Sequence, residues 1–277
     1  MFTIKKAAQL TGVPEHTLRA WERRYGLIQP IRSSSGYRLY DEAAILTIRT
    51  MQSLVDAGWS ARDAAAESGR RSRPLPADPV GMDDLLAAAA ELDDEAVARL
   101  LNEQFARASF ESVVDEWLMP ALARVGQAWA HGELSVAGEH LVSSVVMRRL
   151  AAAYEAAGRG VPGPPVLIGA PPEVDHEIGL LAFATAVRRA GLPTVYLGAQ
   201  VPTEAWVHAA TKVQPNHVVS ALHRRKDAPR LAPVAAALAD VPGARLWVGG
   251  RHQDAAPAPW QPLGHSIAEG ARLLVRP

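Results

Sequence analysis

The chain has 277 residues, no cysteine, and 29 basic and 29 acidic side chains, so its formal net charge is zero. This length allows two or three compact domains, and the lack of cysteine excludes disulfide bonds, thiolate metal sites and cysteine-based redox sensing. The first residues do not resemble a signal peptide, and we find no apolar run long enough to span a bilayer. We therefore expect a cytoplasmic protein without a membrane segment.

The zero net charge hides a division along the chain. Residues 1–73 carry 12 basic and 7 acidic side chains, residues 74–160 carry 6 and 14, and residues 161–277 carry 11 and 8. A basic block next to an acidic block indicates separate domains, of which the first is suited to binding phosphate.

The first segment predicts a helix-turn-helix. Residues 3–12 and 15–25 have helical spacing and are joined by a turn at Gly12. Leu18 and Trp21 lie three residues apart, so we expect both to pack inward from one face of the second helix. Such a pair of helices, with Arg and Thr exposed on the second, is the geometry that enters a DNA major groove. The side chains that we expect on this outward face are His16, Thr17, Arg19 and Arg23.

A small β-wing is predicted after these helices. Tyr37, Arg38 and Tyr40 follow a turn at Gly36, and Arg and Tyr side chains on a wing can bind phosphate and sugar. The alternative is a small helical domain whose arginines are merely solvated.

The stretch Leu18-Arg-Ala-Trp-Glu-Arg-Arg-Tyr-Gly-Leu27, followed by Gly36-Tyr-Arg-Leu-Tyr40, resembles the MerR family over roughly residues 2–70. The resemblance implies a winged helix-turn-helix that binds a partly symmetric double-stranded DNA operator as a dimer or higher oligomer. It also implies that Arg19 and Arg38 contact the DNA.

Two segments rich in proline and glycine predict linkers, at residues 68–79 and 158–165. Between them, apolar residues recur at helical spacing and glycine is sparse, which predicts about four helices and hence a four-helix bundle.

Beyond the second linker, short apolar runs alternate with alanine-rich helical stretches, which is typical of a Rossmann-like α/β domain with a parallel sheet. The predicted strands are Val166–Ile168, Val195–Leu197, Val218–Ala221 and Leu246–Val248. The expected domains are a MerR-type winged helix-turn-helix at 1–73, a helical bundle at 80–158 and the α/β domain at 164–277.

Ligands of open α/β domains bind beyond the carboxyl ends of the strands. His176 and Gly179 follow the first predicted strand, Ser220 and Leu222 lie at the end of the third, and Gly249-Gly250 follows the fourth. An imidazole can ligate a metal, and small residues let a bulky group approach the backbone. Taken singly, these residues have ordinary alternatives: a surface histidine, a locally bonded serine and a glycine turn.

The order of these motifs resembles the cobalamin-binding domain of B12 proteins, together with the segment 191–202 that contains Gly198. The resemblance implies that His176 replaces dimethylbenzimidazole as the lower axial ligand of cobalt. It also implies that the displaced nucleotide tail passes the serine and the glycine pair. This family usually has an acidic residue two places before the histidine, where it orients the ring. Here that place is Val174, flanked by Glu173 and Asp175.

The bundle contains a second candidate motif. We expect one helix to end at His131-Gly132 and Ser135 to cap the next. The ordinary interpretation is a tryptophan in the core and a solvated helix start. The spacing of Trp, nine residues and Glu-His resembles the CarH/LitR photoreceptors, which are MerR regulators that sense light with adenosylcobalamin. The residues that this resemblance places over the upper face of the corrin are Trp129, Val136, Glu139 and His140.

One position in this motif departs from the family. Members that capture cobalt from above use a histidine directly after the tryptophan. Here that residue is Ala130, and His131 follows it as a candidate upper ligand. Together with Val174, this departure leaves three possibilities open: cobalamin, a linear tetrapyrrole such as biliverdin in addition or instead, and a cofactor-free domain controlled by a protein partner.

The predicted function is a light-responsive transcriptional regulator, in this case a repressor. It binds adenosylcobalamin, assembles into a dimer or tetramer on operator DNA in the dark, and leaves the DNA on illumination. Cofactor binding that favours one assembly also sets the DNA affinity, through linkage and multivalency. A B12-dependent enzyme or methyl carrier is disfavoured, because the chain shows no substrate barrel or nucleophile–base pair and the DNA-binding segment would be unexplained.

Overall fold

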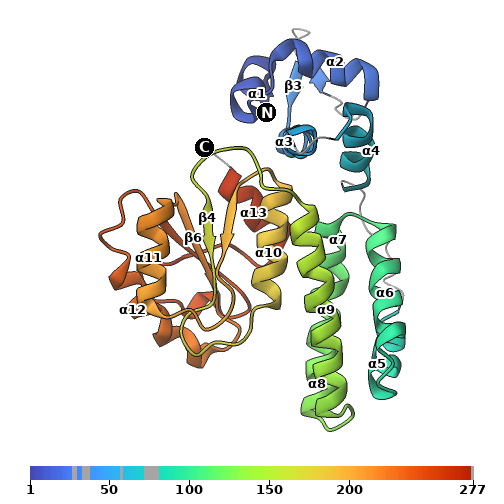
Figure 1. Cartoon of the computed structure of the whole chain (residues 1–277), viewed down its shortest axis with the longest axis vertical. Coiled ribbons are helices and arrows are strands. Elements are labelled where there is room, and N and C mark those ends of the chain that lie inside the picture. The colour runs from blue at the N-terminus through green and yellow to red at the C-terminus, as the bar shows by residue number, and fades with distance from the viewer. Residues whose placement is uncertain (27–29, 33–37, 57–58, 72–80, 276–277) are drawn as a thin grey trace.

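The computed structural model describes residues 1–26, 30–32, 38–56, 59–71 and 81–275. Three parts follow one another along the chain: a small N-terminal part, a helical bundle and an α/β domain (Figure 1). The predicted fold class is confirmed in all three, as a winged helix-turn-helix, a four-helix bundle and a Rossmann-like parallel sheet. In the part of the chain that is described, no helix combines the length and hydropathy needed to cross a bilayer.

The N-terminal part has a core of its own, formed by its helices and a small sheet. Leu18 and Trp21 are buried in that core, as predicted. The three-stranded antiparallel sheet has the order β1-β3-β2. Its elements are β1 (Phe2–Thr3), α1 (Ile4–Thr11), α2 (Glu15–Tyr25), β2 (Ile31–Arg32), β3 (Arg38–Tyr40), α3 (Glu42–Asp56) and α4 (Ala61–Arg71).

Two expectations for this part are wrong. Tyr40 does not stand on the wing surface, because β3 is the central strand and the Tyr40 side chain is fully buried in the core. The first linker does not begin at residue 68, because α4 continues to Arg71. The buried Ser68 hydroxyl donates a hydrogen bond to the Ala64 carbonyl one turn earlier, which satisfies it within the helix.

The bundle consists of four helical rods, one of which is interrupted. Its third rod runs from α7 through a π-helical turn, η1, into α8. This turn ends two residues before Pro120, whose ring lacks an N–H for the helical ladder. The rods are α5 (Met82–Ala90), α6 (Asp94–Arg107), α7 (Phe110–Val113) with η1 (Val114–Leu118) and α8 (Met119–Ala130), and α9 (Val136–Ala156).

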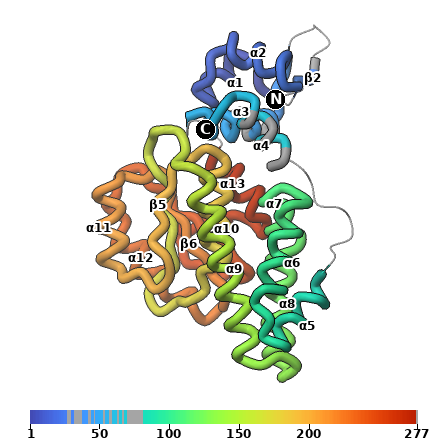
Figure 2. Tube along the Cα trace, turned by 45° about the vertical axis from the view of Figure 1, so that its right-hand side comes forward, coloured from blue at the N-terminus to red at the C-terminus, as the bar shows by residue number. Residues whose placement is uncertain are grey.

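The α/β domain is an open parallel sheet with the strand order β5-β4-β6-β7-β8. Helices α10 and α13 cover the face toward the bundle, and α11 and α12 cover the other face (Figure 2). The last strand, which the sequence did not indicate, is a two-residue edge strand. The elements are β4 (Val166–Ile168), α10 (Ile178–Arg189), β5 (Thr194–Tyr196), α11 (Thr203–Val213), β6 (His217–Ala221), α12 (Leu231–Ala237), β7 (Arg245–Gly249), β8 (Gln261–Pro262) and α13 (Ile267–Val275).

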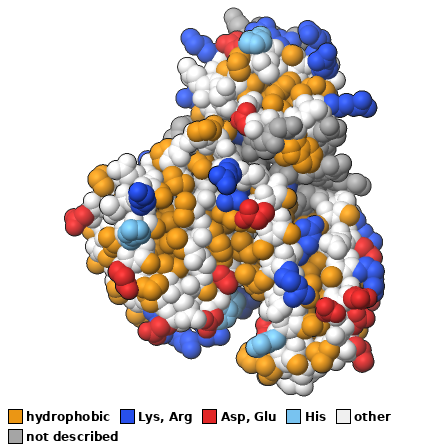
Figure 3. Space-filling view, in the orientation of Figure 1, with side chains coloured by type: hydrophobic (Ala, Val, Ile, Leu, Met, Phe, Trp, Pro, Cys, Tyr) orange, Lys and Arg blue, Asp and Glu red, His pale blue; other side chains and the backbone are white. Residues whose placement is uncertain are grey.

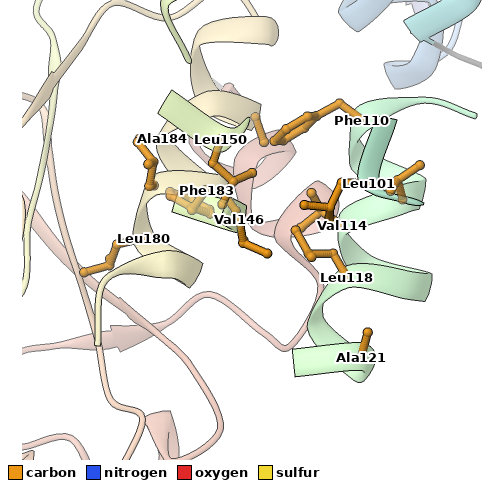
Figure 4. Packing of buried hydrophobic residues seen from close by; sticks show 14 of the residues in the cluster. Leu101, Phe110, Val114, Leu118, Ala121, Val146, Leu150, Leu180, Phe183 and Ala184 are labelled. Carbon is orange, nitrogen blue, oxygen red and sulfur yellow. The ribbon is translucent and has the colours of Figure 1, made fainter. Parts of the chain in front are cut away.

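The bundle and the sheet domain share one hydrophobic core. Val146 and Leu150 on α9 lie beside Phe183 on α10 (Figure 4). Asp115 in η1 adds a polar tie, because its carboxylate accepts hydrogen bonds from the Ser266 hydroxyl and from two backbone N–H groups at the start of α13. Buried apolar contact and a helix cap therefore hold the bundle against the sheet domain.

Candidate functional site

Helix α2 presents a polar face opposite its buried side. His16, Arg19 and Arg23 are exposed at spacings of three and four residues, so they share one face of the helix, while Thr17 is half-buried. Arg19 lies 3.5 Å from Glu15, and both side chains are largely exposed. An ion pair of this kind contributes little stability, so Arg19 can exchange Glu15 for a phosphate at small cost.

The wing strand β3 is tied to the same helix. Arg38 donates a hydrogen bond from Nε to Glu22 Oε1 at 3.0 Å, which fixes its guanidinium beside α2. A guanidinium has five N–H donors, so its remaining donors can still reach a phosphate. Tyr37, the other predicted wing contact, lies outside the described residues.

The sheet has a topological switch point between β4 and β6. From β4 the chain passes first to β5 on one side and then crosses to β6 on the other side, so the direction of strand addition reverses at this point. Open α/β sheets of this order bind ligands at the carboxyl ends of that strand pair. His176 lies in the loop after β4, while Ser220 and Leu222 lie at the end of β6. The structure therefore brings these predicted residues to one edge of the sheet.

His176 is a half-buried imidazole at this edge. Burial, and next the Arg224 guanidinium, lower its pKa, while Asp227, Asp175 and Glu139 act in the opposite direction. The lowered pKa favours the neutral ring, which is the form that binds a metal. Across the described residues, we find no group of three His, Asp or Glu side chains that could hold a metal ion. A single imidazole suits a metal that brings its other ligands with it, as a tetrapyrrole does.

The two carboxylates beside Val174 have other partners. Val174 itself is buried in the apolar core. Glu173 forms an ion pair with Arg230, and Asp175 accepts a hydrogen bond from the Gln200 amide. In the described structure, neither carboxylate is hydrogen-bonded to His176, so neither makes the orienting contact that was expected of an acid at position 174.

Ser220 and the glycine pair lie at the same edge of the sheet as His176, where a ligand would bind. The Ser220 hydroxyl is fully buried, and among the described residues it has no hydrogen-bond partner. Such an atom is costly, and a polar ligand atom would satisfy it. Gly250 approaches the Leu222 backbone closely, whereas a Cβ on Gly179 would meet no described atom within 4 Å. An unpaired buried hydroxyl and a glycine with open space beside it are compatible with a bound group that carries polar atoms, such as the nucleotide tail of a cobalamin.

Gly198 connects the loop after β5 to the loop after β4 through a backbone hydrogen bond. Its φ is +83°, in the left-handed region, and its carbonyl accepts a hydrogen bond from the Ala170 N–H at 2.9 Å. Nearby, the Tyr196 hydroxyl donates to Glu177 Oε2 at 2.7 Å, next to His176 in the chain. Burial, followed by this hydrogen bond, raises the pKa of Tyr196. These contacts tie the His176 loop to β5.

Replacing Gly250 with alanine is expected to destabilise this edge. The new Cβ would lie 2.5 Å from the Leu222 carbonyl oxygen, at a φ of +90°, so the backbone would have to shift. The expected cost is about 1–3 kcal/mol, read as a lower midpoint of thermal unfolding. Gly249→Ala is the matched control, because its Cβ meets no described atom closer than 4.0 Å and its φ is not positive. Equal midpoints for the two variants would contradict the prediction.

The tip of the bundle exposes two large apolar side chains. Trp129 at the end of α8 is 48% exposed, and Val136 at the start of α9 is 56% exposed. The alternative that Trp129 belongs to the core is therefore wrong. The helix limits are as predicted, with His131 at the end of α8 and the Ser135 hydroxyl accepting a hydrogen bond from the Gly138 N–H.

Glu139 is held in place on the same tip. Its two carboxylate oxygens lie 2.8 Å from His140 Nδ1 and 2.8 Å from the Ser143 hydroxyl. His131 is exposed beyond the last turn of α8. A notch separates this tip from the lower end of the α/β domain (Figure 3), which is the end where β4 and β6 finish (Figure 1). Glu139 is one of the acidic groups that act to raise the pKa of His176.

The C-terminal end of α10 joins all three parts of the chain. The Arg189 guanidinium donates to both carboxylate oxygens of Glu111 on α7, at 2.7 and 3.1 Å. The Arg189 carbonyl accepts a hydrogen bond from the Thr50 hydroxyl on α3 at 2.7 Å. Helix α10 begins two residues after His176, and its 12 residues span about 18 Å. A single rod therefore connects the candidate cobalt ligand with the DNA-binding part.

The motifs did not indicate two residues of the site. His223 and Arg224 follow Ser220-Ala-Leu222 directly, and both contact the His176 ring. Their place at the end of the same strand was a usable signal, because side chains that follow β4 and β6 meet at one edge.

Comparison with known proteins agrees with this arrangement. Residues 2–66 match the MerR HTH family regulatory protein, and residues 82–154 match the B12 binding domain. The HTH-type transcriptional repressor CarH of Myxococcus xanthus is 34% identical over 233 residues, which cover 78% of this chain and 77% of that protein. The HTH-type transcriptional repressor CarA of the same organism is 31% identical over 234 residues, which cover 83% and 80%. The monomethylamine corrinoid protein of Methanosarcina barkeri shares the fold, with a TM-score of 0.54 and 16% identity over 69% of this chain and 95% of that chain.

Proposed function

The chain belongs to the family of the MerR-type transcriptional repressors CarH and CarA, and on this premise we propose that it is a light-responsive repressor that uses adenosylcobalamin. In the dark, the loaded protein assembles into a dimer or tetramer and holds operator DNA. Illumination changes the assembly and releases the DNA. The proposed domains are residues 1–73 for DNA binding, 80–158 for the cap and 164–277 for the lower cobalamin site.

One observation carries the proposal. His176 follows β4 at the switch point of the sheet and the exposed Trp129 ends α8, so both belong to the end of the molecule where a notch separates the bundle tip from the α/β domain. The exposed tryptophan and the exposed valine on this tip present apolar surface to water, which is unfavourable in free energy. A flat apolar group held between the two sides covers that surface and places its metal near His176.

Each side of the notch has a separate task in this proposal. His176 supplies a nitrogen lone pair, Ser220 donates its unused hydroxyl to the tail, and Gly179 and Gly249 leave room for it. Trp129 and Val136 exclude water from the upper face, and Glu139 is held ready as a hydrogen-bond acceptor. Bound adenosylcobalamin supplies a cobalt–carbon bond that visible light breaks. Helix α9 carries Glu139 near its start and shares a hydrophobic core with α10 through Val146 and Leu150, so a shift of the tip can reach the end of α10 that contacts the DNA-binding part.

The test is the visible spectrum of the protein loaded with adenosylcobalamin in the dark, before and after green light, followed on a sizing column. We expect the cofactor to remain bound through the column, and both the spectrum and the oligomer size to change on illumination. A Trp129→Ala variant should bind but lose the coupling between spectrum and size. Cobalamin that washes off, or light that changes the spectrum and not the assembly, would contradict the proposal.

Val174 is the observation that favours a second candidate. Because a buried valine replaces the usual acid, cobalt ligation lacks one of its normal supports, and a linear tetrapyrrole such as biliverdin is the alternative ligand. Incubation with biliverdin in the same experiment separates the two. A stable red-absorbing complex with biliverdin, formed without any retention of cobalamin, would favour the second candidate.

Replacing Arg19 with alanine is expected to weaken DNA binding by removing one phosphate contact. Each such contact contributes about one unit to the slope of log affinity against log salt concentration. We therefore expect a shallower slope, by about 1, in binding titrations over a salt series. Arg62→Ala is the control, because Arg62 is exposed on α4 of the same part and lies outside the α2 face. An equal slope for both variants would show that Arg19 makes no phosphate contact.

A further inference from the structure

His223 packs flat against the candidate cobalt ligand. The centroids of the His176 and His223 rings lie 4.3 Å apart, and their planes differ by 14°. His223 follows Leu222 at the end of β6, so it reaches His176 from the neighbouring strand across the switch point. No part of the His-x-x-Gly, Ser-x-Leu and Gly-Gly motifs accounts for this ring.

The orientation of the His176 ring needs an explanation, because the usual one does not apply. A ligating histidine is normally oriented by a hydrogen bond from its second nitrogen to a carboxylate or carbonyl. Here Val174 is buried in the core, and the nearby carboxylates of Glu173, Asp175 and Glu177 bind Arg230, Gln200 and Tyr196. Within the described part of the chain, the ring contacts on His176 come from His223 and Arg224.

These two contacts differ in what a bound metal does to them. Arg224 Nη2 lies 3.2 Å from His176 Nε2, so the guanidinium faces the lone pair of that nitrogen. A metal at Nε2 takes this lone pair, and the guanidinium must then leave. His223 contacts the face of the ring and no lone pair, so it can stay in place while the metal binds. Stacking against a flat neighbour limits rotation of the imidazole about its bond to Cβ.

We propose that His223 is the positioning residue that holds the His176 ring for cobalt, in place of the carboxylate that Val174 replaces. The proposal rests on the proposed function, namely that cobalamin binds through His176. It has a chemical consequence: a stacked ring fixes the imidazole plane but, unlike a carboxylate, accepts no proton from the second nitrogen. A flat apolar ring at position 223 should therefore serve as well as histidine.

The experiment is electron paramagnetic resonance of the full-length protein loaded with cob(II)alamin, with histidine labelled with ¹⁵N. In the wild type, we expect hyperfine splitting from one labelled axial nitrogen, and His176→Ala should lose it. His223→Ala should lose or broaden this splitting and raise the Kd for cob(II)alamin by about 10-fold, the lower end of the effect of removing an outer-shell partner. His223→Phe should restore both, because it keeps a flat ring. His223 is exposed, and thermal unfolding of each unloaded variant checks that the fold persists.

Arg225→Ala is the matched control, because Arg225 lies two residues after His223 and its guanidinium pairs with Asp254. Splitting and affinity that are unchanged in His223→Ala would overturn the positioning role while leaving the proposed function intact. A His223→Phe variant that behaves like His223→Ala would overturn stacking as its basis. A wild type without the labelled-nitrogen splitting would overturn both this role and cobalt ligation by His176.

Discussion

Replacing His176 with alanine is expected to remove the only protein-derived ligand that we assign to the lower face of cobalt, and with it stable retention of cobalamin. Loss of an outer-shell partner already weakens metal binding by roughly 10- to 100-fold, so loss of the ligand itself should cost at least that much. The fold should persist, because His176 lies in a loop at the sheet edge and is only half-buried. The measurement is the ratio of visible to ultraviolet absorbance of the protein after a sizing column run in the dark.

His208→Ala is the control for this prediction, because His208 is exposed on α11, on the face of the sheet away from the bundle. We expect the control to retain cobalamin and to keep the dark assembly, and the His176 variant to lose both. A His176 variant that elutes with a full complement of cobalamin would show that the pocket alone holds the cofactor, and the lower-ligand assignment would then fail.

The second large effect is expected at the joint of the three parts. Arg189→Ala breaks a bidentate pair with Glu111 whose side chains are only 10% and 18% exposed. The Glu111 carboxylate is then left without its cation in a poorly solvated place, which typically costs about 3–5 kcal/mol. The contact of the guanidinium with the Phe110 ring is lost as well. The measurement is the midpoint of urea unfolding, followed by circular dichroism.

Two further variants make this prediction specific. Arg225→Ala also breaks an ion pair, but its partners are 65% and 63% exposed, so the midpoint should hardly change. The double variant Arg189→Met/Glu111→Leu removes both charges together and should recover most of the lost stability, because replacing a buried pair by apolar residues is often neutral. If Arg189→Ala were no more harmful than Arg225→Ala, the joint would not be a stabilising contact.

Short-range patterns in the sequence were sufficient for most of the secondary structure. Helix α2 was expected at residues 15–25 and runs from Glu15 to Tyr25, because two buried side chains at helical spacing define its inner face. The start of α9 was expected at Ser135, because the cap is a hydrogen bond between residues three apart. Interactions that close within one turn depend on local order alone, so they can be read without knowledge of the fold.

The candidate site was only partly predictable from the sequence. The motif residues His176 and Ser220 are brought to one sheet edge, as parallel strands require. The roles assigned to them remain predictions. Tyr40 was misplaced because its exposure depends on β3 being the central strand, which the strand itself does not reveal. The alternative that buried Trp129 in the core failed for the same reason, because a helix tip is exposed or covered by what packs beside it.

The sequence by itself therefore determined the family, the order of the three parts, and the elements whose caps and apolar spacing lie within a few residues. Only the tertiary structure decided which distant side chains meet: His223 on His176, Arg189 on Glu111, and Asp115 at the start of α13. The physical reason is that each of these contacts joins different elements. Its geometry depends on strand order and helix packing over a shared core, and not on the residues that flank it in the chain.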